Sequence, residues 1–212
     1  MKKIVFFGDS ITDAGRIRDK SSKEVKRFGN GYVFLIEAEL AKKYPTEYQI
    51  VNRGISGDRI VDLYARIKED VYVEKPDYLS ILVGVNDVWH ELHRGNGVEE
   101  ERFDRFYRLM LDEALRKFPD LKILIIEPYI LKGFATDDKY EGFLIVKNYA
   151  KIIRKIASDY NIPFIETQKP FDAFVEKYGD EYLVVDGVHP GIGGCAVLKD
   201  LWLEAFENLI KE

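Results

Sequence analysis

Short apolar runs alternate with helical patterns along the chain, and this alternation restricts the possible folds more than any other feature. Strands joined through helices are typical of a parallel sheet with right-handed crossovers. The apolar runs lack polar alternation, which indicates a sheet buried on both faces. We predict five strands: Lys3–Gly8, Tyr48–Asn52, Tyr78–Val83, Leu121–Ile126 and Pro163–Glu166.

The segments between the strands show helical periodicity. In the first of them, Phe34, Leu35, Ala38 and Ala41 follow the spacing of a buried helix face. We predict an α/β fold, a three-layer α/β/α sandwich, and expect residues 1–212 to form one domain because no linker or repeat interrupts them. The predicted helices are Gly31–Lys43, Arg59–Glu69, Glu99–Phe118, Asp138–Tyr160 and Gly193–Ile210.

Composition excludes several classes of function. The net charge of −5 argues against a nucleic-acid-binding face, and no apolar run is long enough to span a membrane. The chain passes from Met1 directly into the first predicted strand with no signal-peptide pattern, so we expect a cytoplasmic protein. The single cysteine, Cys195, excludes an internal disulfide and is expected to be a small buried thiol.

Polar, glycine-containing segments follow the predicted strands. Gly8-Asp9-Ser10 follows the first, Asn52–Asp58 the second and Gly84–Asp87 the third, while Asp186–Pro190 precedes the last helix. In a parallel sheet, ligands bind beyond the carboxyl ends of the strands. We therefore expect these four segments to meet at one edge, although each alone could also be a turn or a helix cap.

Together these segments supply the groups needed for acyl transfer. Ser10 can attack a carbonyl carbon, His189 can take its proton, and Asp186 can orient the imidazole. The backbone N–H groups of Ser10 and Gly57 and the side-chain amide of Asn86 can bind the developing oxyanion. This chemistry requires no cofactor, so we expect none.

The four segments, in this order and at this spacing, resemble the four sequence blocks of the SGNH (GDSL-type) serine hydrolases. The resemblance implies a flavodoxin-like parallel sheet of order 2-1-3-4-5, a catalytic triad of Ser10, Asp186 and His189, and an oxyanion hole of Ser10, Gly57 and Asn86. Gly29–Val33 and Gly84–Trp89 are further similar to bacterial intracellular acetylxylan esterases. That similarity implies a symmetric homo-oligomer that removes acetyl groups from xylo-oligosaccharides.

Several residues near the strand ends have two readings. We expect Trp89 and Tyr129 to form an aromatic wall for a sugar ring, although Trp89 could instead pack in the core. Asp9 is expected at the site, either against the substrate or bonded to backbone N–H groups of the nucleophile turn. The segment from Tyr129 to Gly142 could be a rim over the site or a plain surface loop.

Three alternatives stay open: a metal site, a different serine esterase and a non-catalytic domain. His90 and His93 have a spacing that suits a metal ion, but a solvated helix start is the default. Asp58 is expected to cap the helix that begins at Arg59. The chain could be a lipid esterase, thioesterase or lysophospholipase, although no apolar segment suggests an acyl tunnel. A non-catalytic flavodoxin-like binding domain is the remaining alternative, and the complete serine, histidine and aspartate set argues against it.

Overall fold

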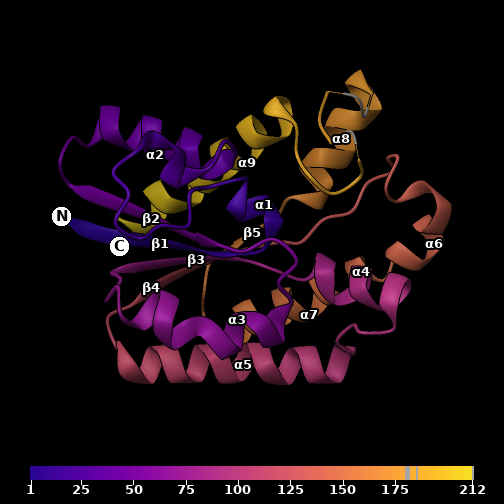
Figure 1. Cartoon of the computed structure of the whole chain (residues 1–212), viewed down its shortest axis with the longest axis horizontal. Helices are drawn as coiled ribbons and strands as arrows, with labels where there is room; N and C mark the ends of the chain where they lie inside the picture. The colour runs from indigo at the N-terminus through magenta and orange to yellow at the C-terminus, as the bar shows by residue number, and fades with distance from the viewer. Residues whose placement is uncertain (180–181, 185, 212) are drawn as a thin grey trace.

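Five parallel strands form one sheet in the computed structural model, which describes residues 1–179, 182–184 and 186–211 (Figure 1). The strand order is β2-β1-β3-β4-β5, as predicted, and each strand end lies within two residues of its predicted position. The strands are β1 (Lys2–Gly8), β2 (Tyr48–Gly54), β3 (Tyr78–Leu82), β4 (Lys122–Ile126) and β5 (Phe164–Ile165).

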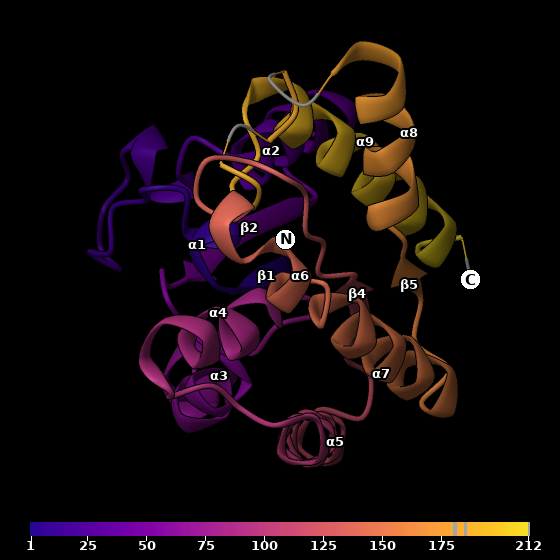
Figure 2. The same cartoon turned by 90° about the vertical axis from the view of Figure 1, so that its right-hand side faces the viewer.

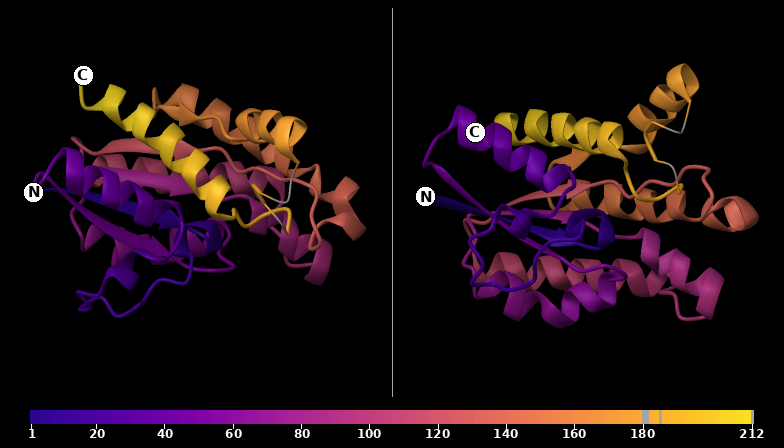
Figure 3. Two further views of the ribbon diagram at one scale, coloured as in Figure 1. Left: turned by 90° about the horizontal axis from the view of Figure 1, so that it is seen from above. Right: turned by 45° about the horizontal axis from the view of Figure 1, so that its top comes forward.

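Helices cover both faces of the sheet, which confirms the three-layer sandwich (Figure 1). One face carries α2 (Tyr32–Lys43), α8 (Gln168–Tyr178) and α9 (Ile192–Leu209), and α2 and α9 lie side by side (Figure 3). The other face carries α3 (Ile60–Ile67), α5 (Glu100–Lys117) and α7 (Val146–Asp159). Three further helices lie toward the carboxyl ends of the strands (Figure 2): α1 (Ser10–Asp13), α4 (Val85–Arg94) and α6 (Tyr140–Phe143). Single turns lie at Val25–Phe28, Lys68–Tyr72 and Asp137–Lys139.

The predicted helices differ from the structure in two places. The single helix predicted over Asp138–Tyr160 is divided, because α6 packs on α4 whereas α7 packs on α5 and the chain must turn between them. Helix α8 was not predicted at all. Only Phe171 of this helix is buried, so its sequence carries little helical periodicity.

An aromatic cluster joins the sheet to α9. The ring of Trp202 lies 5.0 Å from that of Phe6 on β1 and 4.7 Å from that of Phe206, and its indole N–H donates to Ser80 Oγ at 3.0 Å. Because Trp202 and Phe206 are fully buried, these contacts fix the position of α9, which is the helix that follows His189 in the chain.

Helix α1 packs directly on the carboxyl ends of β1 and β2. A Cβ at Gly54 would lie 2.2 Å from the backbone N of Asp13, and one at Gly8 would lie 2.6 Å from Thr12 Oγ1. No side chain fits in either gap. The Asn52 side chain strengthens the contact by donating to the carbonyl O of Thr12 at 2.7 Å. The first helix, which begins at Ser10, is therefore held against the central strand.

Both termini lie at the amino-end edge of the sheet, opposite α1, α4 and α6 (Figures 1 and 3). Over the described part of the chain, no helix has the length and apolar character needed to cross a membrane.

Candidate active site

The site begins at the turn between β1 and α1. Asp9 Oδ1 accepts the backbone N–H of Ile11 at 3.0 Å, which confirms the prediction that Asp9 bonds to this turn. Ser10 is thereby placed as the first residue of α1, partly exposed. Backbone N–H groups at a helix start have no partner within the helix, so the Ser10 amide is available as a donor.

A chain of hydrogen bonds connects Ser10 to His189 and Asp186. Ser10 Oγ lies 2.7 Å from His189 Nε2, and His189 Nδ1 lies 2.6 Å from Asp186 Oδ2. The other carboxylate oxygen accepts the backbone N–H groups of Val188 at 2.8 Å and His189 at 2.7 Å. The fold thus joins a serine and a histidine that are 179 residues apart, as the strand-end pattern predicted.

The electrostatics of this chain favour proton transfer from Ser10. The hydrogen bond to Asp186 raises the pKa of His189 above its ordinary 6.5, against the opposing effect of burial. Partial burial works against ionisation of Asp186, but the bonds from His189 and the two amides lower its pKa below 3.8. The ionised Asp186 accepts a hydrogen bond from the N–H at Nδ1 of His189. The neutral imidazole therefore presents the lone pair of Nε2 to the hydroxyl of Ser10.

Gly57 and Asn86 lie beside Ser10 and retain unused donors. Gly57 has φ +90°, and among the described residues its amide has no acceptor, whereas the amides of Ser56 and Asp58 do. The Asn86 side-chain amide donates one hydrogen to the carbonyl O of Asp58 at 3.1 Å, which leaves a second hydrogen. Their predicted role as oxyanion donors stays a prediction.

A cavity of about 630 Å³ opens above these groups. Half-buried Trp89 lines it and also packs on Phe143, at 5.1 Å between ring centroids. Its predicted role as a wall for a sugar ring stays a prediction. Sequence reasoning missed the lining role of His90 and Arg94, although both follow Asn86 at helical spacing on α4. The lining comprises Ser10, Ser56, Gly57, Asp58, Asn86, Trp89, His90, Arg94, Val188 and His189.

Tyr129 does not reach the cavity, and its prediction as a sugar-binding wall is wrong. Its side chain is fully buried, with its ring 4.4 Å from that of Phe171. Its hydroxyl donates to the carbonyl O of Val188 at 2.8 Å. Tyr129 therefore supports the backbone next to His189 from within the core.

The segment that follows Tyr129 also supports this loop instead of forming a rim. The backbone N–H of Leu131 donates to Gly187 O at 3.0 Å, and that of Ala135 donates to Asp186 O at 3.2 Å. Gly187 has φ +93°, and a Cβ there would lie 2.2 Å from Thr136 Oγ1. None of these supporting residues is part of the cavity lining.

Asp9 is also too deeply buried to touch a substrate, so that part of its prediction is wrong. It belongs to a pair of buried carboxyl groups with Asp87, whose Oδ1 accepts the backbone N–H of Ile60 at 3.0 Å. Among the described residues, Oδ2 of each carboxyl group has no hydrogen-bond partner. Burial raises the pKa of Asp9 from 3.8 to about 7 and that of Asp87 well above 3.8.

The remaining predictions at this edge have mixed outcomes. Asp58 does not cap α3; it pairs with Arg66, and Asp62 instead accepts the backbone N–H of Arg59 at 2.9 Å. His93 stacks on Trp89 with ring centroids 4.8 Å apart. In the described ranges, no cluster of three or more histidine, cysteine or acidic residues could hold a metal ion.

The cysteine prediction concerns another part of the fold. Cys195 is buried in the first turn of α9, as predicted.

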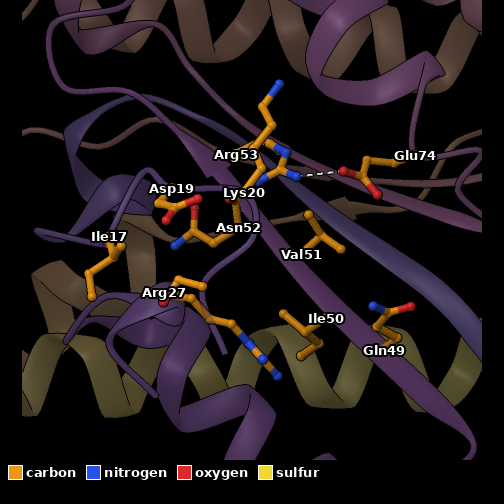
Figure 4. A pocket seen from close by; sticks show the side chains of 11 residues that line it. Ile17, Asp19, Lys20, Arg27, Gln49, Ile50, Val51, Asn52, Arg53 and Glu74 are labelled. Carbon is orange, nitrogen blue, oxygen red and sulfur yellow. Dashed lines mark hydrogen bonds and ion pairs between the residues drawn. The ribbon is translucent and has the colours of Figure 1, made fainter. Parts of the chain in front are cut away.

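A second cavity, of about 130 Å³, lies along the outer edge of β2 (Figure 4). Arg53 points across it to Glu74, with which it forms an ion pair. This cavity shares no lining residue with the one above Ser10.

Comparisons with known proteins agree on one group of enzymes. The model of the GDSL-like lipase/acylhydrolase family matches residues 6–197. An acetylxylan esterase of Geobacillus stearothermophilus is 32% identical over 205 residues, which is 95% of this chain and 92% of the relative. Its crystal structure superposes with a TM-score of 0.85, covering 96% of this chain and 93% of that one at 30% identity. LAE5, an α/β hydrolase from the Lake Arreo metagenome, gives a TM-score of 0.84 at 30% identity, covering 96% and 94%.

The burial of Asp9 predicts a pH-dependent cost to folding. The unfolded chain releases this proton near pH 4 and the folded chain near pH 7, so the wild-type free energy of unfolding should fall across that window. Asp9→Asn keeps the oxygen that accepts from Ile11 and carries no titrating proton. Relative to wild type, the variant should gain up to about 4 kcal/mol between pH 4 and 7, at about 1.4 kcal/mol per pKa unit. Urea unfolding at a series of pH values measures this, with exposed Asp138→Asn as the control; parallel curves for wild type and Asp9→Asn would contradict it.

The hydroxyl of Tyr129 should contribute measurably to stability. Tyr129→Phe leaves the buried carbonyl of Val188 without its donor, which should lower the free energy of unfolding by about 1–3 kcal/mol. Exposed Tyr178→Phe is the matched control and should change it by less than about 0.5 kcal/mol. Equal urea midpoints for the two variants would show that the Tyr129–Val188 bond does not support the loop.

Proposed function

Because this chain belongs to the GDSL-like lipase/acylhydrolase family, we propose that it is a serine esterase that removes acetyl groups from carbohydrate esters such as acetylated xylo-oligosaccharides. The observation that carries the proposal is the hydrogen-bond chain Ser10–His189–Asp186, with its 2.7 and 2.6 Å contacts at the edge of an open cavity. A binding domain has no use for this complete arrangement.

In the first half of the reaction, Ser10 Oγ attacks the acetyl carbonyl carbon as His189 Nε2 takes the hydroxyl proton. The carbonyl oxygen becomes an oxyanion that can bind the N–H groups of Ser10 and Gly57 and the amide of Asn86. When the intermediate collapses, the bond to the sugar oxygen breaks and His189 returns its proton to that oxygen. The sugar leaves with a free hydroxyl, and acetyl remains on Ser10.

In the second half, water takes the place of the sugar. His189 removes a proton from the water, whose oxygen attacks the acetyl-serine carbonyl carbon. Collapse of this second intermediate releases acetate and returns the proton to Ser10 Oγ. Asp186 stabilises the imidazolium in both halves without itself taking a proton.

The comparisons support the same types of catalytic residue and the same substrate class. The Geobacillus relative is an acetylxylan esterase, and two of its solved structures are described as catalytic mutants in which an aspartate or a serine is replaced by alanine. A serine and an aspartate are also two of the three groups in the hydrogen-bond chain here. Cytoplasmic location and a homo-oligomer stay predictions for this chain.

The cavity lining favours a short acyl group over a lipid chain. Trp89 and Val188 are the large apolar side chains among the described lining residues, and the others are polar, charged or glycine. A long acyl chain would find little apolar surface there, whereas acetyl needs only a small space beside Ser10. Each methylene that is not accommodated should cost on the order of 1–3 kcal/mol in kcat/KM.

One set of rate measurements tests the proposal. Wild type should release acetate from acetylated xylo-oligosaccharides and should hydrolyse 4-nitrophenyl acetate faster than the butyrate and far faster than the octanoate. Ser10→Ala should lower all of these rates by at least about 10³-fold while circular dichroism and the melting temperature stay those of a folded protein. Ser56→Ala, which also changes a serine of the cavity lining, is the matched control. A preference for octanoate would replace the proposal with a lipid esterase, and full activity in Ser10→Ala would refute the mechanism.

Activity should depend on the protonation of His189. Only neutral imidazole can accept the serine proton, so kcat/KM should fall as the pH drops through the pKa of His189, which Asp186 holds above 6.5. Asp186→Asn removes the negative charge, so the acid limb should move to lower pH and the plateau should also fall. A pH profile of kcat/KM for 4-nitrophenyl acetate measures both effects. An acid limb that stays in place in Asp186→Asn would contradict this role.

A further inference from the structure

Three side chains form a stripe along α4, from the reacting centre toward the outer end of the cavity. Asn86, His90 and Arg94 are four residues apart, which places them on one face of the helix, and all three line the cavity with Ser10. At 1.5 Å per residue, the Cα of Arg94 lies about 12 Å along the helix axis from that of Asn86. The acyl carbonyl would lie at the first of these residues and the leaving group along the other two.

Arg94 carries a charge that no carboxylate balances within the described residues. The two other arginines near this end are neutralised, because Arg59 pairs with Asp62 and Arg66 pairs with Asp58. Arg94 is exposed and forms no ion pair in the part of the chain that the structure describes. Its guanidinium is therefore free to bind a group from outside.

The groups behind the stripe do not offset this charge. Asp9 and Asp87 are buried with raised pKa values, and Asp186 is hydrogen-bonded to His189. Burial lowers the pKa of His90, and the charges of Arg59 and Arg94 lower it further. His90 is thus a neutral ring beside the leaving-group path, and the unpaired positive charge lies beyond it.

We infer that the outer end of this cavity binds a carboxylate carried by the substrate. The substrate class is thereby narrowed to acidic acetylated oligosaccharides. A uronic acid unit next to the acetylated sugar has such a carboxylate, and guanidinium binds carboxylate through two parallel hydrogen bonds. The inference rests on the proposed function, since it adds a charge requirement to the same leaving group. Trp89 and His90 would lie along the sugar between the ester and the carboxylate.

Competitive inhibition of 4-nitrophenyl acetate hydrolysis tests the inference independently of acetyl release from sugars. The two inhibitors are acetyl-free xylo-oligosaccharides of equal length, one with and one without a glucuronic acid branch. For wild type, the acidic inhibitor should have an inhibition constant about 5- to 10-fold lower, and this preference should weaken as salt is added. Arg94→Gln should remove the preference, and Arg94→Lys should retain part of it.

The control is Arg105→Gln on α5, which removes one positive charge outside the cavity lining. Equal inhibition constants for the two sugars in wild type would overturn the inference, and so would an equal loss of preference in Arg105→Gln and Arg94→Gln. Release of acetate from acetylated xylo-oligosaccharides is measured in parallel. If wild type releases none while the preference for the acidic inhibitor persists, the proposed substrate fails and the carboxylate site stands.

Discussion

The close approach of α1 to the ends of β1 and β2 is the constraint on which the site depends. Glycine at positions 8 and 54 removes the side chains that would separate these elements. Ser10 is the first residue of this helix, so any displacement of α1 would move its hydroxyl relative to His189. A misplacement of about 1 Å in such an arrangement can cost about 10²-fold in rate.

The histidine half of the site has a separate support. The loop that contains Asp186 and His189 is bonded to the segment after β4, through the Tyr129 hydroxyl and the amides of Leu131 and Ala135. Serine and histidine are therefore positioned by different strands, and they meet only because those strands belong to one sheet. The geometry of the pair depends on the rigidity of the whole sheet and not on a local motif.

Sequence reasoning reached the sheet, its order and the meeting of Ser10 with His189, because apolar runs and the strand-end rule carry that information. It could not place Tyr129, because the sequence pattern of an aromatic residue after a strand does not depend on where its side chain points. The ring could face a cavity or, as here, its hydroxyl could donate to the carbonyl of Val188, 59 residues away. Asp58 illustrates the same limit: an aspartate before a helix suggests a cap, but here Arg66 binds it from the next turns of α3. Helix α8 was missed because most of its side chains face away from the core.

Both chain ends lie at the edge of the sheet remote from α1, the helix that begins at Ser10 (Figure 1). This arrangement matters for attaching the protein to something else. A peptide tag, a carrier domain or a solid support joined at either end would lie behind the sheet, and the cavity would face the surrounding solution. Large dissolved oligosaccharides could then approach an immobilised molecule as freely as a dissolved one.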